Sequence, residues 1–286
     1  MSKTIRETWN DIAYHLDDWG PPLRPCAEDL RISLGALARW HAENPVATVR
    51  VFLCGVTPEI TTMQWPFPIE LIGMDHAESM VRVVWPGDIP GLRKALVGDW
   101  RQSGLPPQSR DVVIGDGGFG FFDYPDGQRT LATALVKLLQ PRGLFVYRHF
   151  AQAERRETLQ EVLAAMHAGR IGSFHIFKFR VAMSLQADSS SGVKLDDIWR
   201  VCTTAGIDPA RLPQPGWSQR AISTIRFYEG KESRLYFPTL EEFRELLAES
   251  FQDIEVACPD YELGERSPIL TARPRIGSRP TRHPLG

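Results

Sequence analysis

The stretch FQDIEVACPDYELGERSPILTARP, residues 251–274, decides the fold. It contains two strand-like runs, FQDIEVACP (251–259) and PILTARP (268–274), joined by the short segment DYELGERS. Parallel neighbouring strands need a long crossover connection, usually a helix, and this segment has no room for one. The sequence therefore predicts an antiparallel hairpin that closes a sheet.

Upstream of this hairpin, short apolar runs alternate with helix-like segments. The runs are VRVFLC (49–54), PIELIG (68–73), DVVIG (111–115) and GLFVYR (143–148), with a weaker candidate in KALVGDW (94–100). They are apolar almost throughout, which is typical of strands covered by helices on both faces, and LATALVKLLQ (131–140) supplies an intervening helix. The pattern predicts an α/β fold with a doubly wound, mostly parallel sheet.

The remaining segments suggest how the chain is divided. Residues 1–45 read as N-terminal helices, broken by the proline-rich WGPPLRPC (19–26), and are a candidate lid. Residues 46–150 form the α/β core, and 151–235 are too long for an ordinary connection, so we predict a helical insertion or cap that binds a substrate. Residues 236–274 complete the core with a helix and the hairpin, and 275–286 are predicted to be disordered.

Composition narrows the classes of partner. The 286 residues carry a net charge of -2, which gives little attraction to polyanions, so nucleic acid is not expected as the main partner. No run has membrane-spanning length, and the N-terminus lacks a signal-peptide core. The four cysteines form no C-x-x-C pair, so we expect a cytoplasmic protein without a zinc site or disulfide framework. The oligomeric state does not follow from the sequence.

Ligands of an open α/β sheet bind at the carboxyl ends of its strands. Gly55 follows the first run and permits a tight turn, and Pro58 and Glu59 suit the start of a helix. Asp75 ends the second run 20 positions after Gly55, where an acidic side chain accepts hydrogen bonds from ribose hydroxyls. The plain alternatives are that Gly55 is only a turn and that Asp75 only caps a helix.

Further polar or aromatic residues follow the next two runs. Asp99 and Trp100 offer an acceptor and an aromatic face suited to a purine, and Asp116 ends the run DVVIGD. Asp-Gly is also ordinary turn chemistry, and Trp100 is equally compatible with the core.

These segments together resemble a class I S-adenosylmethionine-dependent methyltransferase. The motifs are LCGVTPE (53–59), GMDHAESM (73–80), VGDW (97–100), DVVIGDG (111–117) and LLQPRGLFVYR (138–148), followed by the hairpin. The resemblance covers about residues 48–150 and 238–274, and it implies a seven-stranded, Rossmann-like methyltransferase fold with S-adenosylmethionine as cofactor. The first motif of that family is typically D/E-x-G-x-G-x-G, and this chain keeps only one of its glycines, Gly55.

The resemblance also implies roles for individual residues. Asp75, in the pattern D-x-x-x-x-M, binds the ribose, Asp99 with Trp100 lies beside the adenine, and the turn at Gly55 borders the methionine part. Arg24, in the candidate lid, is suited to pair with a carboxylate. The predicted cofactor-binding residues are Gly55, Thr57, Asp75, Met80, Asp99, Trp100, Asp116 and Arg24.

A second group of residues is predicted to act on the acceptor. The strand GLFVYRHF carries Arg148 and His149 out at its carboxyl end. An acceptor hydroxyl that needs deprotonation would use His149 or Asp116 as base, whereas an amine needs none. Arg148, His175 and Phe177 are predicted to bind substrate, although a packing segment is the simpler interpretation of FHIFKF (174–179). No histidine spacing indicates a metal site.

The sequence thus predicts a methyltransferase that transfers a methyl group to an O or N nucleophile of a small organic molecule. Two alternatives stay open. One is a non-catalytic S-adenosylmethionine-binding or partner protein. The other is an NAD(P)-dependent Rossmann oxidoreductase, which the one-glycine turn and the closing hairpin disfavour.

Overall fold

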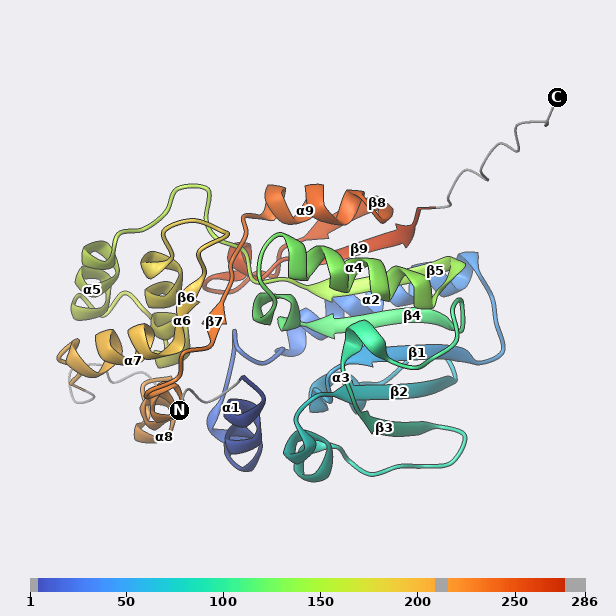
Figure 1. The fold of residues 1–286 in the computed structure, drawn as a ribbon, viewed down its shortest axis with the longest axis horizontal. Coiled ribbons are helices and arrows are strands. Elements are labelled where there is room, and N and C mark those ends of the chain that lie inside the picture. The colour runs from blue at the N-terminus through green and yellow to red at the C-terminus, as the bar shows by residue number, and fades with distance from the viewer. Residues whose placement is uncertain (1–4, 209–215, 276–286) are drawn as a thin grey trace.

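A seven-stranded sheet in the order β3-β2-β1-β4-β5-β9-β8 forms the centre of the molecule (Figure 1), in a computed structural model that describes residues 5–208 and 216–275. The five strands from β3 to β5 are parallel, whereas β9 is antiparallel to both of its neighbours, β5 and β8. The predicted fold class is therefore confirmed, including the C-terminal hairpin. The strands are β1 (Val49–Cys54), β2 (Ile69–Asp75), β3 (Arg93–Val97), β4 (Arg110–Asp116), β5 (Leu139–Arg148), β8 (Phe251–Ala257) and β9 (Ile269–Pro274).

Helices cover both faces of this sheet. In Figure 1, α2 (Ala27–Glu43) lies behind the sheet, and α4 (Asp126–Leu138) and α9 (Leu240–Ala248) lie in front of it. A capping box holds the start of α9, where the Thr239 hydroxyl accepts from the Glu242 amide and the Glu242 carboxylate accepts from the Thr239 amide. The shorter elements are α1 (Ile5–Ile12), η1 (Ala13–Asp18), α3 (Pro58–Thr61), η2 (Met80–Val84), η3 (Trp100–Gln102), η4 (Gly118–Phe121) and η7 (Gly264–Arg266).

The side chains of the apolar strands pack into two cores, one on each face of the sheet. Successive side chains of a strand point to opposite faces, so Val51 and Leu53 of β1 pack with Leu37 of α2, while Phe52 between them packs with Phe243 of α9. All five side chains are fully buried. This burial on both faces explains why the strand runs are apolar throughout rather than alternating.

The cap lies to one side of the sheet (Figure 1), and its apolar core also includes Ile12 and Trp19 of the N-terminal segment. Phe174, Phe177, Ile198 and Trp217 are buried there. A two-stranded sheet, which the sequence did not predict, pairs β6 with β7 inside the cap. Its elements are α5 (Leu159–His167), α6 (Phe174–Leu185), β6 (Val193–Lys194), α7 (Leu195–Thr204), α8 (Gln219–Ser223), η6 (Thr224–Tyr228) and β7 (Arg234–Leu235). The exact division of the chain at residues 45, 150 and 235 stays a prediction.

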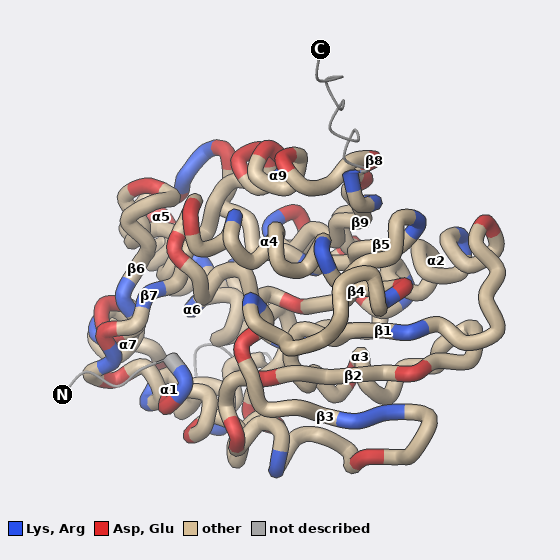
Figure 2. The backbone as a smooth tube through the Cα atoms, turned by 45° about the vertical axis from the view of Figure 1, so that its right-hand side comes forward, with Lys and Arg blue, Asp and Glu red and all other residues tan. Residues whose placement is uncertain are grey.

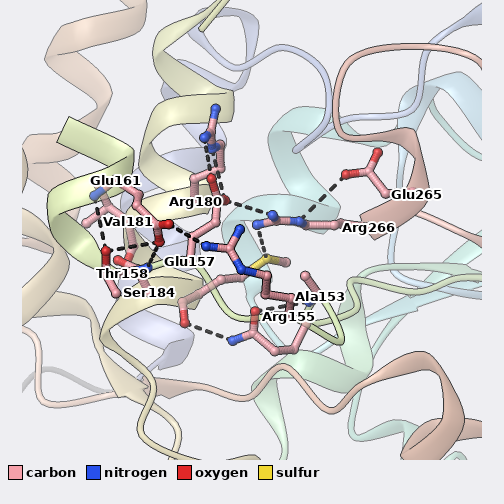
Figure 3. Close-up of polar contacts among 12 residues, drawn as sticks. Ala153, Arg155, Glu157, Thr158, Glu161, Arg180, Val181, Ser184, Glu265 and Arg266 are labelled. Carbon is pink, nitrogen blue, oxygen red and sulfur yellow. Dashed lines mark hydrogen bonds and ion pairs between the residues drawn. The ribbon is translucent and has the colours of Figure 1, made fainter. Parts of the chain in front are cut away.

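A carboxylate ties the cap to the closing hairpin (Figure 3). Glu157, in the segment after β5, accepts hydrogen bonds from Arg180 of α6 and from Arg266, which lies between β8 and β9. The Arg266 Nη2 to Glu157 Oε2 distance is 2.7 Å, and all three side chains are largely buried. Such charge-assisted bonds fix the orientation of the groups that they join.

Several element boundaries differ from those predicted. The helix predicted at 131–140 begins earlier and ends at Leu138, because β5 takes over at Leu139 and includes the QPRG segment. The helix after Gly55 is a single turn. The segment DYELGERS, for which no helix was predicted, contains the short 3-10 helix η7. The predicted disordered tail lies outside the described residues from 276 onward.

Charged residues of both signs are mixed along the chain (Figure 2), with α9 mainly acidic. The four cysteines carry free thiols. In the described ranges, no helix is long and apolar enough to cross a membrane.

Candidate active site

A pocket of about 610 Å³, here called the strand-end pocket, lies where β1, β2 and β4 end. The strands contribute Gly55, Asp75 and Asp116 to its walls, and the N-terminal segment covers it with Trp9 and Arg24. All but one of the predicted cofactor-binding residues line this pocket. They are Gly55, Thr57, Asp75, Met80, Trp100, Asp116 and Arg24.

The Gly55 turn brings backbone to the floor of the strand-end pocket. Gly55 has φ of +106°, which side chains disfavour, and its amide donates to the Met74 carbonyl at 2.7 Å. A Cβ at this position would lie 3.9 Å from Asp75 Oδ2, an ordinary contact distance. The backbone conformation rather than a lack of space therefore calls for glycine, and the Asp75 carboxylate faces the turn.

Asp75 is held in place by the backbone that follows it. Its Oδ1 accepts from the Ala77 amide at 2.8 Å, and the residue is only 8% exposed. Burial raises the pKa of Asp75 to about 6, and the hydrogen bonds from the Ala77 and His76 backbone only partly oppose this. The capping and ligand-binding interpretations are compatible, because one oxygen serves the turn while the other faces the pocket.

An ion pair closes the other side of the strand-end pocket. Arg24 Nε donates to Glu59 Oε1 at 2.7 Å, and Arg24 Nη1 donates to the Leu16 carbonyl. Glu59 Oε2 is buried and has no hydrogen-bond partner among the described residues. A guanidinium and a half-satisfied carboxylate side by side are suited to a ligand that carries both a carboxylate and an ammonium group.

A second cavity of about 1100 Å³, the side pocket, adjoins the first and shares His76, Trp100 and Phe121 with it. Trp100 also belongs to the core, since its Nε1 donates to the Met74 carbonyl at 2.5 Å. Asp99 lines only the side pocket, and both of its oxygens accept from Arg101, which lowers the pKa of Asp99. A ligand that donates to Asp99 must share it with Arg101.

A third cavity, the aromatic pocket, encloses about 640 Å³ between the N-terminal helix α1, the end of β4 and the cap. It shares Trp9, Leu23, Asp116 and Phe121 with the strand-end pocket. Trp9 and Phe121 meet edge to face, with ring centroids 5.4 Å apart, where the two pockets adjoin. The aromatic wall consists of Trp9, Trp19, Phe121, Phe150, Phe179, Tyr228 and Phe237.

A buried charge network lies behind this junction. Arg148 donates from Nε to Asp116 Oδ1 at 2.6 Å and from Nη2 to Asp116 Oδ2 at 3.1 Å, and its Nη1 reaches Asp29 Oδ2 at 3.3 Å. Tyr261 donates its hydroxyl to Asp29 Oδ1. Burial raises the pKa of Asp116 despite the attraction of Arg148, whereas for Arg148 the two carboxylates outweigh burial and raise the pKa.

This network corrects two predictions. Arg148 does not line any of the three pockets; it is 4% exposed and is occupied by Asp116 and Asp29, so it positions Asp116 instead of binding substrate. Asp116 does line the strand-end and aromatic pockets. Both of its oxygens are engaged by Arg148, so it is a poor general base.

The prediction of His149 as a catalytic base is wrong in its placement. Its ring stacks on Phe243 of α9 with centroids 3.7 Å apart, and burial lowers its pKa to about 3. His149 follows Arg148 directly, and the alternation of a strand turns the two side chains to opposite faces of the sheet. Arg148 therefore reaches α2 on the pocket side, and His149 enters the core beneath α9.

His175 and Phe177 are also packing residues. Phe177 is fully buried in the cap, where it contacts Trp217. His175 lies parallel to Trp19 with centroids 6.0 Å apart, and its Nε2 is 3.1 Å from the Asp18 carbonyl. Neither side chain lines the aromatic pocket, so the prediction of substrate binding is wrong and the packing alternative holds.

Sequence reasoning missed several wall residues. Trp9 and Trp19 come from the candidate lid, and Phe121 follows Asp116 in the segment GDGGFGFF. Their only signal was aromatic character close to a predicted strand end or in a proposed lid. Gly118 lies in the same segment, and only a glycine fits there because a Cβ would lie 2.5 Å from the Trp100 ring.

Comparison with known proteins gives a fold but no close relative. No family model matches the sequence, and neither does any curated protein. A protein described as a putative Zn-dependent alcohol dehydrogenase from Rhodobacter sphaeroides is 13% identical, with TM-score 0.61 over 96% of this chain and 100% of the other. In the described ranges, no three His, Cys, Asp or Glu side chains are grouped to hold a metal ion.

Two further similar structures are described as containing methyltransferases. One chain comes from the complex between the Haloferax volcanii Trm112 methyltransferase activator and the putative methyltransferase, at 12% identity and TM-score 0.52 over 96% of this chain and 97% of the other. The N-methyltransferase NodS from Bradyrhizobium japonicum WM9 is 13% identical, with TM-score 0.49 over 94% and 97%. Together with the antiparallel β9 between β5 and β8, the likeness to the Haloferax complex shows that this chain has the Rossmann-like fold of the class I S-adenosylmethionine-dependent methyltransferases.

Proposed function

We propose that this protein is an S-adenosylmethionine-dependent methyltransferase that acts on a small organic molecule. The observation that carries the proposal is the buried Asp75 carboxylate, which ends β2 and faces the Gly55 turn inside the strand-end pocket. The fold places ribose-binding carboxylates at such strand ends.

The residues of the strand-end pocket fit the parts of this cofactor. Asp75 is the acceptor for the two ribose hydroxyls, and the side pocket beside Trp100 offers a flat space for the adenine. Arg24 would bind the methionine carboxylate, and the unpaired Oε2 of Glu59 would accept from the ammonium group. S-adenosylmethionine has no pyrophosphate, so the one-glycine turn at Gly55 suits it better than it suits a dinucleotide, although the first motif of the family has three glycines.

The acceptor would occupy the aromatic pocket. S-adenosylmethionine, when bound, supplies a methyl group activated by the positive charge on sulfur. Trp9, Leu23, Phe121 and Asp116 border both pockets and would align the acceptor with that methyl group and exclude water. Arg148 keeps Asp116 fixed at the junction through two hydrogen bonds.

Calorimetry with S-adenosylhomocysteine tests the proposal through Asp75. Asp75→Asn keeps an oxygen for the Ala77 amide but removes the negative charge, so we expect at least ten-fold weaker binding with an unchanged melting temperature. The wild-type protein should also bind more weakly as pH falls through about 6, because the Asp75 carboxyl then becomes protonated.

The exposed Asp197→Asn on α7 is the matched control and should bind like wild type. NAD is titrated in parallel. Tight binding of NAD without S-adenosylhomocysteine would replace the proposal by a nicotinamide enzyme, and binding of neither would leave a partner protein. Equal affinity in wild type and Asp75→Asn would remove Asp75 from the site.

A further inference from the structure

We infer that the acceptor is an uncharged, ring-containing molecule that attacks through a neutral nitrogen atom and not through an anion. This inference rests on the proposed function and names the substrate class of its aromatic pocket. Three properties of the pocket carry it: an apolar wall, the absence of an available base, and an excess of carboxylates at one end.

The wall is apolar and built from rigid rings. Seven of its side chains are aromatic, and Ile12, Leu23, Leu195 and Leu235 add aliphatic surface. Rings with edge-to-face and stacking partners favour a flat ligand, whereas a ligand charge inside such a wall is disfavoured by desolvation.

The described lining of the pocket offers no free general base. Among these described residues, Asp116 is the only carboxylate, imidazole or amine, and Arg148 engages both of its oxygens. His149 and His175 are buried in packing contacts, and His76 lines the strand-end and side pockets but not the aromatic pocket. A hydroxyl acceptor would therefore keep its proton, while a neutral nitrogen already has a lone pair for the attack.

The charges around the pocket favour positive charge at the junction. Asp116 and Asp29 flank the single Arg148, which leaves one more carboxylate than guanidinium behind the strand end of the pocket. In the cap, Lys178 does not line the pocket, and its Nζ lies 3.7 Å from the centroid of the Trp19 ring. An anionic nucleophile at the junction would be repelled, and a cationic product would be stabilised.

Methyl transfer from the sulfonium to a neutral nitrogen needs no further reactant. The nitrogen lone pair forms the new bond to the methyl carbon, and the carbon–sulfur bond breaks with its electron pair left on sulfur. The product nitrogen carries the positive charge and, where it bears a hydrogen, releases a proton to water after leaving the pocket.

Binding of three matched probes to the S-adenosylhomocysteine complex tests the inference by calorimetry. Quinoline represents the neutral nitrogen acceptor, N-methylquinolinium its methylated product, and 2-naphthoate an anion of similar size. We expect quinoline and N-methylquinolinium to bind at least ten-fold more tightly than 2-naphthoate. Equal or tighter binding of 2-naphthoate would overturn the inference.

Two variants locate the effect. Leu235→Glu brings a charge into the apolar wall and should weaken quinoline binding at least ten-fold, whereas Leu92→Glu, at an exposed position that lines none of the three pockets, should bind quinoline like wild type. Asp29→Asn should weaken the binding of N-methylquinolinium but not that of quinoline. Unchanged N-methylquinolinium affinity would refute the argument from the excess of carboxylates. The comparison of the three probes uses only the wild-type protein, so it tests the inference even if a variant does not fold.

Failure of this inference is distinguishable from failure of the proposed function. S-adenosylhomocysteine affinity is measured first and without probes, so its loss concerns the strand-end pocket alone. Probe binding is then repeated without S-adenosylhomocysteine, which reports on the aromatic pocket independently.

Discussion

Lys178 is an ionisable side chain in an apolar place. It is 2% exposed in the cap core, donates to Thr224 Oγ1 at 3.2 Å, and lies over the rings of Trp19 and Tyr228. Burial lowers its pKa from 10.5 to about 7, while the two ring faces favour the ammonium form and oppose this change. Desolvation therefore disfavours the charged form of Lys178, whereas the contacts with the two aromatic rings favour it.

Replacement of this lysine should change how stability depends on pH. Between pH of about 7 and 10.5 the unfolded chain binds more protons at Lys178 than the folded one, so the wild-type free energy of unfolding rises with pH in this window. Lys178→Met should remove that rise and stabilise the protein at pH 7 by about 1–3 kcal/mol. Denaturant unfolding at pH 7 and 9 measures both.

Lys194→Met, at a half-exposed lysine paired with Glu232, is the control and should keep the wild-type dependence. A loss of stability in Lys178→Met at pH 7 would show that the ring contacts outweigh desolvation.

At the residue scale, the sequence predicted positions better than orientations. Asp75 and Gly55 were found because a strand end and its next turn follow from local pattern. His149 was assigned wrongly because the side chain after Arg148 points to the other face, and sequence alone does not tell which face holds the pocket. Glu59 was noted only as a helix-start residue, since its partner Arg24 is distant in the chain.

At the element scale, Glu157 connects the cap helix α6 with the hairpin connection (Figure 3). Glu157→Gln keeps the shape but leaves Arg180 and Arg266 without their charged partner in a largely buried place. We expect a loss of about 1–3 kcal/mol in the free energy of unfolding. Hydrogen exchange should rise in α6 and stay unchanged in β1.

An exposed pair provides the comparison. Glu241→Gln removes the partner of Arg244 on the surface of α9 and should change stability by less than about 0.5 kcal/mol. Equal effects of the two substitutions, or faster exchange in β1 for Glu157→Gln, would argue against a specific tie between cap and hairpin.

The elements themselves were largely predictable. The apolar runs predicted each of the five parallel strands, and the segment from residue 236 predicted a helix before the hairpin, which is α9. The two residue pairs that join β6 and β7 carry too little pattern to be detected. The extension of β5 back to Leu139 was missed because its pairing with Arg110 crosses an irregular register that only the fold defines.

At the scale of the whole molecule, two buried histidines govern the response to acid. Burial lowers the pKa of both His149 and His175 from 6.5 to about 3, and for His175 the charge of Lys178 adds to this. Between pH 6.5 and 3 the unfolded chain binds more protons at these rings, so stability falls as pH falls. The raised pKa values of Asp75 and Asp116 act in the opposite direction, for Asp75 between pH of about 6 and 3.8.

His149→Phe should make the protein more resistant to acid. Phenylalanine keeps the stack on Phe243 and removes both the protonation site and the unpaired Nε2. We expect its melting temperature to fall less than that of wild type between pH 7 and 4, with a difference of a few kcal/mol in the free energy of unfolding at pH 4. His167→Phe, at an exposed position on α5, serves as control. Parallel curves for wild type and His149→Phe would contradict the assignment.

The topology of the whole molecule followed from the sequence, but its three adjoining pockets did not. The order of parallel strands and a closing hairpin follow from connection length and handedness. The aromatic pocket is assembled from Trp9 near the N-terminus, Phe121 after β4, and Phe237 after the cap. Contacts between such distant segments depend on packing that no local pattern describes.

The separate origin of the pocket walls has a consequence for evolution and engineering. The strand-end pocket is built mostly on the ends of β1, β2 and β4, whereas Phe179, Leu195 and Leu235 of the aromatic pocket belong to the cap. Changes in those three positions alter what the cavity accepts without disturbing the sheet. Under the proposed function, the range of accepted substrates can therefore change through the cap while the strand ends stay the same, and directed evolution of this protein should begin with libraries at the three cap positions.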